Sequence, residues 1–145
     1  MKITVKMALR GVFVALGCFV LIQLIPYGHN RVNPPVVKEP VWDSPSTRDL
    51  AKRVCFNCHS NETTWPWYSR VAPVSWLIYN DVQEGRSKMN FSDWRDVSGE
   101  QFKHEIGGGS MPPVQYRLAH PEAKLTSAEK EKLIEGLSKT AAASR

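Results

Sequence analysis

A continuous apolar run near the N-terminus constrains this chain most, because it decides which part of the sequence can fold in water. The run reads GVFVALGCFVLIQLIPY from Gly11 to Tyr27, and Gln23 is its only strongly polar side chain before the proline. Counted from Met7, it reaches the roughly 20 residues that span a bilayer, and Arg10 can extend its charge to the head groups. We therefore expect residues 1–27 to form a single-pass anchor in a lipid bilayer.

Two other uses of this run stay open. A cleaved signal peptide has an apolar core of about 7 to 15 residues, but no clear small-x-small cleavage site follows Ile25. The stretch ALGC, which ends at Cys18, loosely resembles a lipoprotein signal, yet its leucine is displaced and the apolar run continues beyond the cysteine. An uncleaved anchor is the preferred interpretation.

The charges indicate the orientation of the anchor. The formal net charge is +5, and Lys2, Lys6 and Arg10 supply three of these charges ahead of the run, which leaves about +2 for the rest. Basic residues before a span place the N-terminus in the cytoplasm and the following chain on the periplasmic side of the inner membrane. No dense basic stripe interleaved with aromatic residues follows, so we expect no nucleic-acid partner.

The segment after the anchor separates it from a folded domain. Residues 28–45 read GHNRVNPPVVKEPVWDSP, with four prolines and neither a helical nor an alternating period, which predicts an extended linker. The chain has 145 residues, enough to fill one core. We expect that single domain to cover residues 46–140, followed by a tail at 141–145.

A cysteine pair lies at the start of this domain, in the pentapeptide CFNCH from Cys55 to His59. Ser46 and Asp49 resemble a capping box, and the apolar residues that follow have helical spacing, so we expect a helix that leads into the motif. Cys55 and Cys58 are three residues apart and project from nearly the same side, with His59 where the helix turns. The two thiols and the imidazole can therefore bind the same metal ion or cofactor.

Covalent haem attachment explains this order most directly. Both thiols can add to the vinyl groups, while His59 reaches the iron from the same side, which predicts one haem c per chain. Zinc would need four ligands, and only His104 and His120 follow as further imidazoles. A redox-active dithiol of the thioredoxin type normally follows a strand, whereas here we expect a helix before the motif. We also expect the second ring nitrogen of His59 to bond a backbone carbonyl near Pro66 or Pro73.

The sixth iron ligand is expected to be Met111. It lies in IGGGSMPPVQY, where glycines allow close backbone approach to a haem plane and Pro112 keeps Met111 out of the α region. Met89, in RSKMNFSDW, is interpreted as a packing residue. His120 or an open position are the alternatives, and His104 is expected to be a solvated helix residue.

Further helices complete an all-α prediction for a small, cytochrome c-like domain. Thr126 and Glu129 form a capping box before an apolar stripe, which predicts a final helix of about three turns. A helical run from Trp76 is expected to stop at Gly85, and NFSDW is expected to start another helix.

Several separate blocks, CFNCHSNETTWPWYS, APVSWLI, EGRSKMNFSDW and MPPVQYRLAHPEAKLTSAEK, resemble the haem-binding-domain family of small membrane-anchored bacterial proteins. The resemblance covers roughly residues 48–139. It implies covalent haem on Cys55 and Cys58 with His59 as the proximal ligand. More distantly, the glycine-rich loop with MPP before a capped terminal helix is similar to class I cytochromes c.

These observations together predict single-electron transfer at the outer face of the cytoplasmic membrane, with membrane or periplasmic redox proteins as partners. An electron carrier is preferred to an enzyme. The alternatives are a peroxidase-like haem with an open sixth position and a haem-based sensor.

Overall fold

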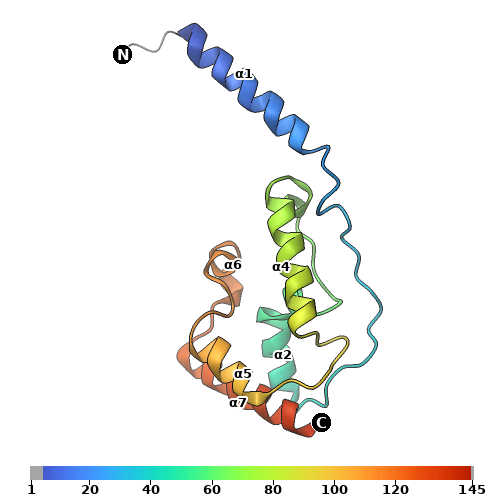
Figure 1. The fold of residues 1–145 in the computed structure, drawn as a ribbon. Helices are drawn as coiled ribbons and strands as arrows, with labels where there is room; N and C mark the ends of the chain where they lie inside the picture. Colours follow the sequence, from blue (N-terminus) through green and yellow to red (C-terminus); the bar gives the residue numbers. More distant parts are fainter. Residues whose placement is uncertain (1–4, 145) are drawn as a thin grey trace. The chain divides into compact units, whose positions relative to one another are not determined.

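The computed structural model describes residues 5–144, and within that range the chain is helical (Figure 1). The α-helices are α1 Val5–Ile22, α2 Pro45–Val54, α3 Phe56–His59, α4 Val74–Lys88, α5 Gly99–Phe102, α6 Val114–Ala119 and α7 Ser127–Ala143. Shorter turns are η1 Trp67–Arg70, the π-turn η2 Lys103–Gly107 and η3 Pro121–Ala123. The β-pairing in this range is one isolated bridge between Lys38 and Asp93, which confirms the all-α prediction.

The chain divides into two compact units. The first unit contains the described residues up to 32 together with 65–81, and the second contains 33–64 together with 82–144. Residues 74–81 of α4 therefore belong to the first unit, and residues 82–88 belong to the second.

The first unit joins α1 to a later segment of the chain. α1 is long and apolar enough to cross a membrane, and its side chains are exposed along almost its whole length. Beyond Ile22 the chain leaves the helix through a turn. There the side-chain amide of Gln23 bonds the main chain of Ala72.

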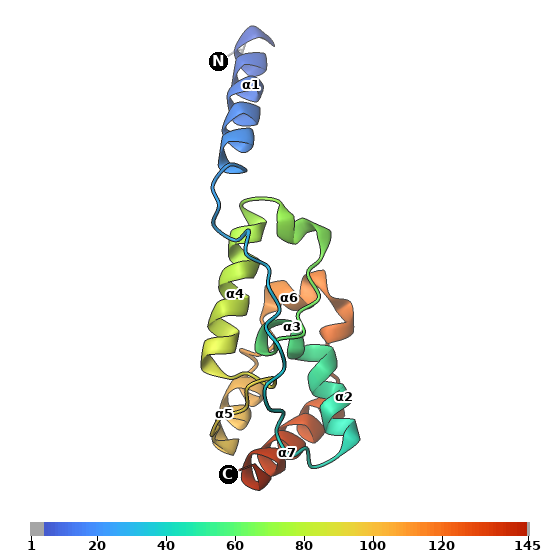
Figure 2. The same ribbon diagram turned by 90° about the vertical axis from the view of Figure 1, so that its right-hand side faces the viewer.

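The second unit has an aromatic and aliphatic core. Phe91 is fully buried and stacks on Phe56 at 5.2 Å, on Trp42 at 5.2 Å and on Trp94 at 5.8 Å between ring centroids. α7 adds Leu133 and Leu137 to this core and packs against α2 and the α5–η2 helix (Figure 2). Burial of large side chains like these supplies most of the driving force for folding, at about 25 cal/mol per Å² of apolar surface.

The helix boundaries confirm one cap and correct another. Thr126 and Glu129 form the expected capping box, although α7 runs for 17 residues rather than about three turns. The expected box at Ser46 and Asp49 is wrong, because Ser44 caps α2 instead, with its hydroxyl accepting from the Thr47 N–H at 3.3 Å. Pro45 then occupies the first helical position, where a missing N–H removes no helical bond.

The expected helix at NFSDW is also wrong. Residues 89–98 form a turn and an irregular segment, in which the side chain of Asn90 accepts from the Ser92 N–H at 2.8 Å. The Phe91 N–H donates to the His59 carbonyl at 2.8 Å. These bonds outside a helix, together with burial of Phe91 and Trp94, decide the local structure against helix propensity.

Candidate haem site

The cysteine and histidine motif occupies a helical turn of its own. α2 ends at Val54, Cys55 departs from helical geometry with φ −119°, and α3 contains the rest of the motif. The His59 N–H still donates to the Cys55 carbonyl at 2.9 Å, which closes the turn. Phe56 is buried in the core, whereas both cysteines and His59 are half-buried, so the motif is fixed by its first intervening residue.

Gly85 lets α4 lie directly against the motif. A Cβ at this position would be 2.6 Å from the carbonyl oxygen and 3.1 Å from the Cβ of Cys58. The expected helix stop at Gly85 is wrong, because α4 continues to Lys88. Glycine is required here by close contact, and an isolated glycine within a helical pattern was the signal that could have revealed it.

Arg86 secures the chain that leaves the motif. Its Nε donates to the carbonyl of Ser60 at 2.8 Å, and its Nη2 donates to Thr63 Oγ1 at 3.0 Å. The two residues Gly85 and Arg86 thus fix α3 and its exit to the same stretch of α4.

His59 is oriented by a backbone carbonyl. Its Nδ1 lies 3.2 Å from the carbonyl oxygen of Met89, which can only accept, so Nδ1 carries the proton and Nε2 is the nitrogen able to bind iron. Burial lowers the pKa of His59, although the backbone at Met89 and Gly85 partly opposes this. The expectation of a carbonyl acceptor is confirmed. Its location was wrong, because Pro66 and Pro73 belong to the first unit.

The surroundings of the two thiols differ from those of a redox-active dithiol. Cys55 and Cys58 are not joined in a disulfide, and burial together with the neighbouring Cys58 raises the pKa of Cys55 to about 12. A reactive dithiol needs a lowered thiol pKa. Across residues 5–144, no three His, Cys, Asp or Glu side chains gather in a way that could hold a metal, so the four donors that zinc requires are not assembled there.

Met111 follows a sharp reversal of the chain. η2 ends at Gly107, Gly109 has φ +84°, and the Met111 N–H returns to the Glu105 carbonyl at 3.0 Å. The positive φ explains Gly109. At Gly107 an added Cβ would come no closer than 3.9 Å to Ile134, so packing within the protein does not require glycine there.

The Met111 segment is tied to the motif through α6. Asn57, the second intervening residue of the motif, donates from its side-chain amide to the hydroxyl of Tyr116, a residue of α6, at 2.7 Å. Met111, Tyr116 and Cys55 all pack against the same core. No local pattern indicates the pairing of Asn57 with Tyr116, because the two residues are 59 positions apart in the sequence.

The alternative ligands differ in their surroundings. Met89 holds Nδ1 of His59 through its backbone carbonyl, and its side chain is partly buried against the core of the second unit. His120 stacks on Tyr116 at 4.4 Å between centroids, and its Nδ1 is 2.9 Å from Glu122. His104 is exposed on η2, as expected for a solvated helix residue.

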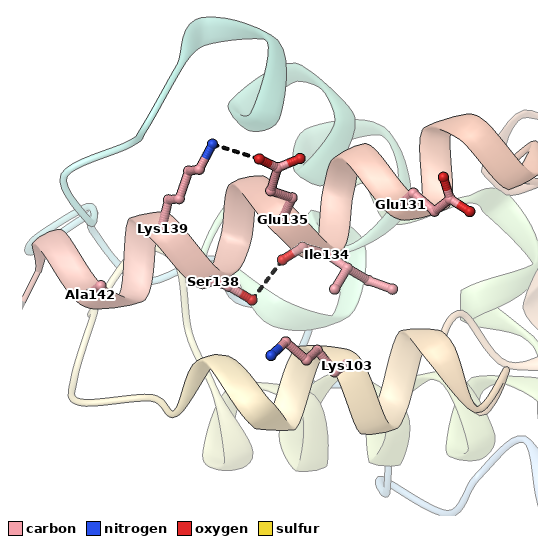
Figure 3. Close-up of a pocket in the computed structure, with 7 residues that line it drawn as sticks. All are labelled: Lys103, Glu131, Ile134, Glu135, Ser138, Lys139 and Ala142. Carbon is pink, nitrogen blue, oxygen red and sulfur yellow. Dashed lines mark hydrogen bonds and ion pairs between the residues drawn. The ribbon is translucent and has the colours of Figure 1, made fainter.

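A groove elsewhere on the second unit does not share this chemistry. It lies between η2 and α7 and is lined by Lys103, Glu131, Ile134, Glu135, Ser138, Lys139 and Ala142 (Figure 3). An ion pair of 2.7 Å between Lys139 and Glu135 spans one of its sides. Neither cysteine, nor His59, nor Met111 lines this groove.

Comparison with known proteins agrees with the chemistry of the motif. The sequence matches the family described as haem-binding domain over residues 17–139. Searches of curated proteins and of solved structures gave no significant match. Because the match covers most of the chain, the protein belongs to the haem-binding-domain family and is a haem-binding protein.

Proposed function

We propose that this protein is a membrane-anchored electron carrier of the c type. In this proposal one haem is attached to Cys55 and Cys58, His59 is the proximal iron ligand and Met111 is the distal ligand. Its partners are membrane or periplasmic redox proteins, and it passes single electrons among them at the outer face of the cytoplasmic membrane.

The orientation of His59 carries the proposal. With the proton of Nδ1 committed to the Met89 carbonyl, Nε2 offers a neutral, fixed donor next to two thiols on the same turn. Such a hydrogen bond makes the ring a better ligand and prevents its rotation. Cys55 and Cys58 would hold the haem by adding their S–H groups across its vinyl double bonds, with sulfur on one carbon and hydrogen on the other, so the attachment would consume no oxidant.

The residues of the chain suit electron transfer because hydrogen bonds and close packing hold the chain around the proposed iron ligands. Haem bound in this way supplies a one-electron iron couple. A thioether from Met111 is a soft, neutral donor that favours ferrous iron and raises the potential. Gly85, the Met89 carbonyl and the Asn57–Tyr116 bond fix the surrounding chain, which keeps reorganisation small.

The location rests on the N-terminal segment. α1 has the length and composition of a span, and Lys2, Lys6 and Arg10 lie at its start or before it. The positive-inside rule then puts the N-terminus in the cytoplasm and the motif outside, where the proposed partners lie.

Extraction of the haem tests the attachment. The denatured full chain should keep its haem through acidic organic extraction, and the double variant Cys55→Ala with Cys58→Ala should release it. Haem that extracts freely from the wild type would refute covalent binding while leaving haem binding itself intact.

The visible spectrum in both oxidation states tests the role. A low-spin ferric spectrum with the weak long-wavelength methionine band supports the carrier. A high-spin ferric protein that binds peroxide would replace the carrier with a peroxidase-like enzyme. A change of spin state in His120→Ala but not in Met111→Ala would assign two histidine ligands.

A further inference from the structure

Gln23 is the polar residue within the apolar run, and its side chain has an unusual partner. Its Oε1 accepts from the Ala72 N–H at 2.9 Å, and its Nε2 donates to the Ala72 carbonyl at 3.1 Å. Nε2 also lies 2.9 Å from the Phe19 carbonyl, within α1. The chain immediately after α1 is therefore tied by a reciprocal pair of bonds to a residue 49 positions later in the sequence.

Further contacts of the first unit hold the same two segments together. Gly28 has φ +77°, and a Cβ there would be 2.9 Å from the carbonyl oxygen of Ser75. Tyr27 meets Tyr79 edge-on at 5.4 Å between ring centroids. Arg31 donates from Nη1 to the Ser69 carbonyl at 3.2 Å. Residues 69–79 are thus fixed to the chain where it leaves α1.

The length of α1 determines where in a bilayer the Gln23–Ala72 pair would lie. Its 18 residues rise by about 1.5 Å each, or about 27 Å in total, which is close to the roughly 30 Å hydrocarbon core of a bilayer. If α1 spans the membrane, Gln23 and its partner Ala72 lie at the boundary between acyl chains and head groups.

The segment docked at this boundary exposes apolar side chains. Trp67 is 77% exposed, Leu77 is 51% exposed and Val74 is 44% exposed. Val74 and Leu77 are three residues apart on α4 and share one face of the helix. Arg70, between them and Trp67, is exposed as well. Tryptophan with a nearby cation is the composition found at membrane interfaces.

We infer that residues 67–77 form an interfacial foot, a second membrane-contacting element that rests in the lipid head-group region beside the outer end of α1. The occupant of this surface is lipid rather than a protein, because Leu24 and Ile25 are also exposed and continue the apolar surface into α1. The inference rests on the proposed anchor. It adds that residues 67–77 touch the outer leaflet. In the sequence, these residues lie between the two parts of the second unit.

Photo-crosslinking to lipid tests the foot in the full, haem-loaded chain. The photoreactive residue p-benzoylphenylalanine is placed singly at Trp67 or Leu77, at Leu16 as a reporter of the span, and at Lys124 as an exposed control in the second unit. Each protein is reconstituted into nanodiscs of phosphatidylcholine and phosphatidylglycerol carrying an alkyne-tagged lipid, and the Soret band confirms an intact haem domain. After irradiation, the lipid adduct is quantified by mass spectrometry.

The foot predicts adducts at positions 67 and 77 within about threefold of position 16 and at least tenfold above position 124. Adducts at position 16 with only the level of position 124 at 67 and 77 would overturn the foot and leave the anchor standing. Failure at position 16 would overturn both. Cross-links from 67 or 77 to a protein in native membranes, without lipid adducts, would also refute the lipid surface.

Discussion

Replacement of Gly85 by alanine tests the packing of α4 on the motif. The added Cβ would lie 2.6 Å from the oxygen and 3.0 Å from the carbonyl carbon of Cys58, both backbone atoms that no side-chain rotation can move. Relief requires α4 and α3 to separate by several tenths of an ångström. Overpacking of this kind costs about 1–3 kcal/mol, whereas alanine gains at most about 1 kcal/mol over glycine in helix propensity. We therefore expect Gly85→Ala to lower the free energy of unfolding by about 1–2 kcal/mol.

The same displacement should reach His59, the proposed proximal ligand. Met89 follows Gly85 by four residues, and its carbonyl holds Nδ1 of His59 at 3.2 Å. A longer hydrogen bond makes the imidazole a weaker donor, so the midpoint potential of the haem should rise. Gln83→Ala, at an exposed position of the same helix, is the matched control and should change the free energy of unfolding by less than about 0.5 kcal/mol.

The assay is urea unfolding of the haem-loaded full chain in nanodiscs, followed by circular dichroism, with a redox titration of each variant. If Gly85→Ala unfolds at the same urea concentration as Gln83→Ala and keeps the wild-type potential, the close contact does not exist.

Two further predictions concern the distal ligand and the final helix. Met111→Ala should produce a high-spin component, lower the midpoint potential of the haem and open a site for carbon monoxide. Met89→Ala should keep the low-spin spectrum and lower the free energy of unfolding in urea by about 2 kcal/mol, because Met89 is only partly buried. Equal spectra for the two variants would contradict the assignment of Met111 as the distal ligand. Hydrogen bonds from the Thr126 N–H and from Arg53 lower the pKa of Glu129 to about 2. The ionised carboxylate therefore stabilises the fold fully above the ordinary carboxyl pKa near 4.5, and this stabilisation is lost as the pH falls toward 2. The stability difference between wild type and Glu129→Gln should therefore be constant from pH 5 to 7 and shrink below pH 4.5, and a difference that does not vary with pH in urea unfolding would refute the role of the charge.

Features encoded within a few neighbouring residues were predictable from the sequence. The capping box at Thr126 and Glu129 needs only a spacing of three, and the structure has both of its bonds. The all-α class, the apolar helix and the family likewise follow from local composition and short motifs. The sequence also predicted the type of bond that His59 makes, because a ligating imidazole needs a partner for its second nitrogen.

Features decided by partners distant in sequence were not predictable. NFSDW has residues that are acceptable in a helix, yet Phe91 closes the core against Phe56 and bonds the His59 main chain, which is 32 positions earlier. Gln23 interrupts an otherwise apolar run for no reason that the neighbouring residues reveal. Its side-chain amide pairs with the main chain of Ala72. In both places a tertiary contact outweighs the local preference of the segment.

Gly85 shows why even a visible signal can be read in two ways. A glycine at the end of an apolar helical pattern predicts a helix stop, and a glycine within a helix predicts close approach of another backbone. The next three residues, Arg86 to Lys88, contain no proline and allow either outcome. The choice is made by Cys58, whose carbonyl occupies the space that a side chain would fill, and by Met89, whose carbonyl can reach His59 because α4 continues to Lys88. The helix that was expected to end at Gly85 is therefore the element that leads to the carbonyl orienting His59, the proposed proximal ligand.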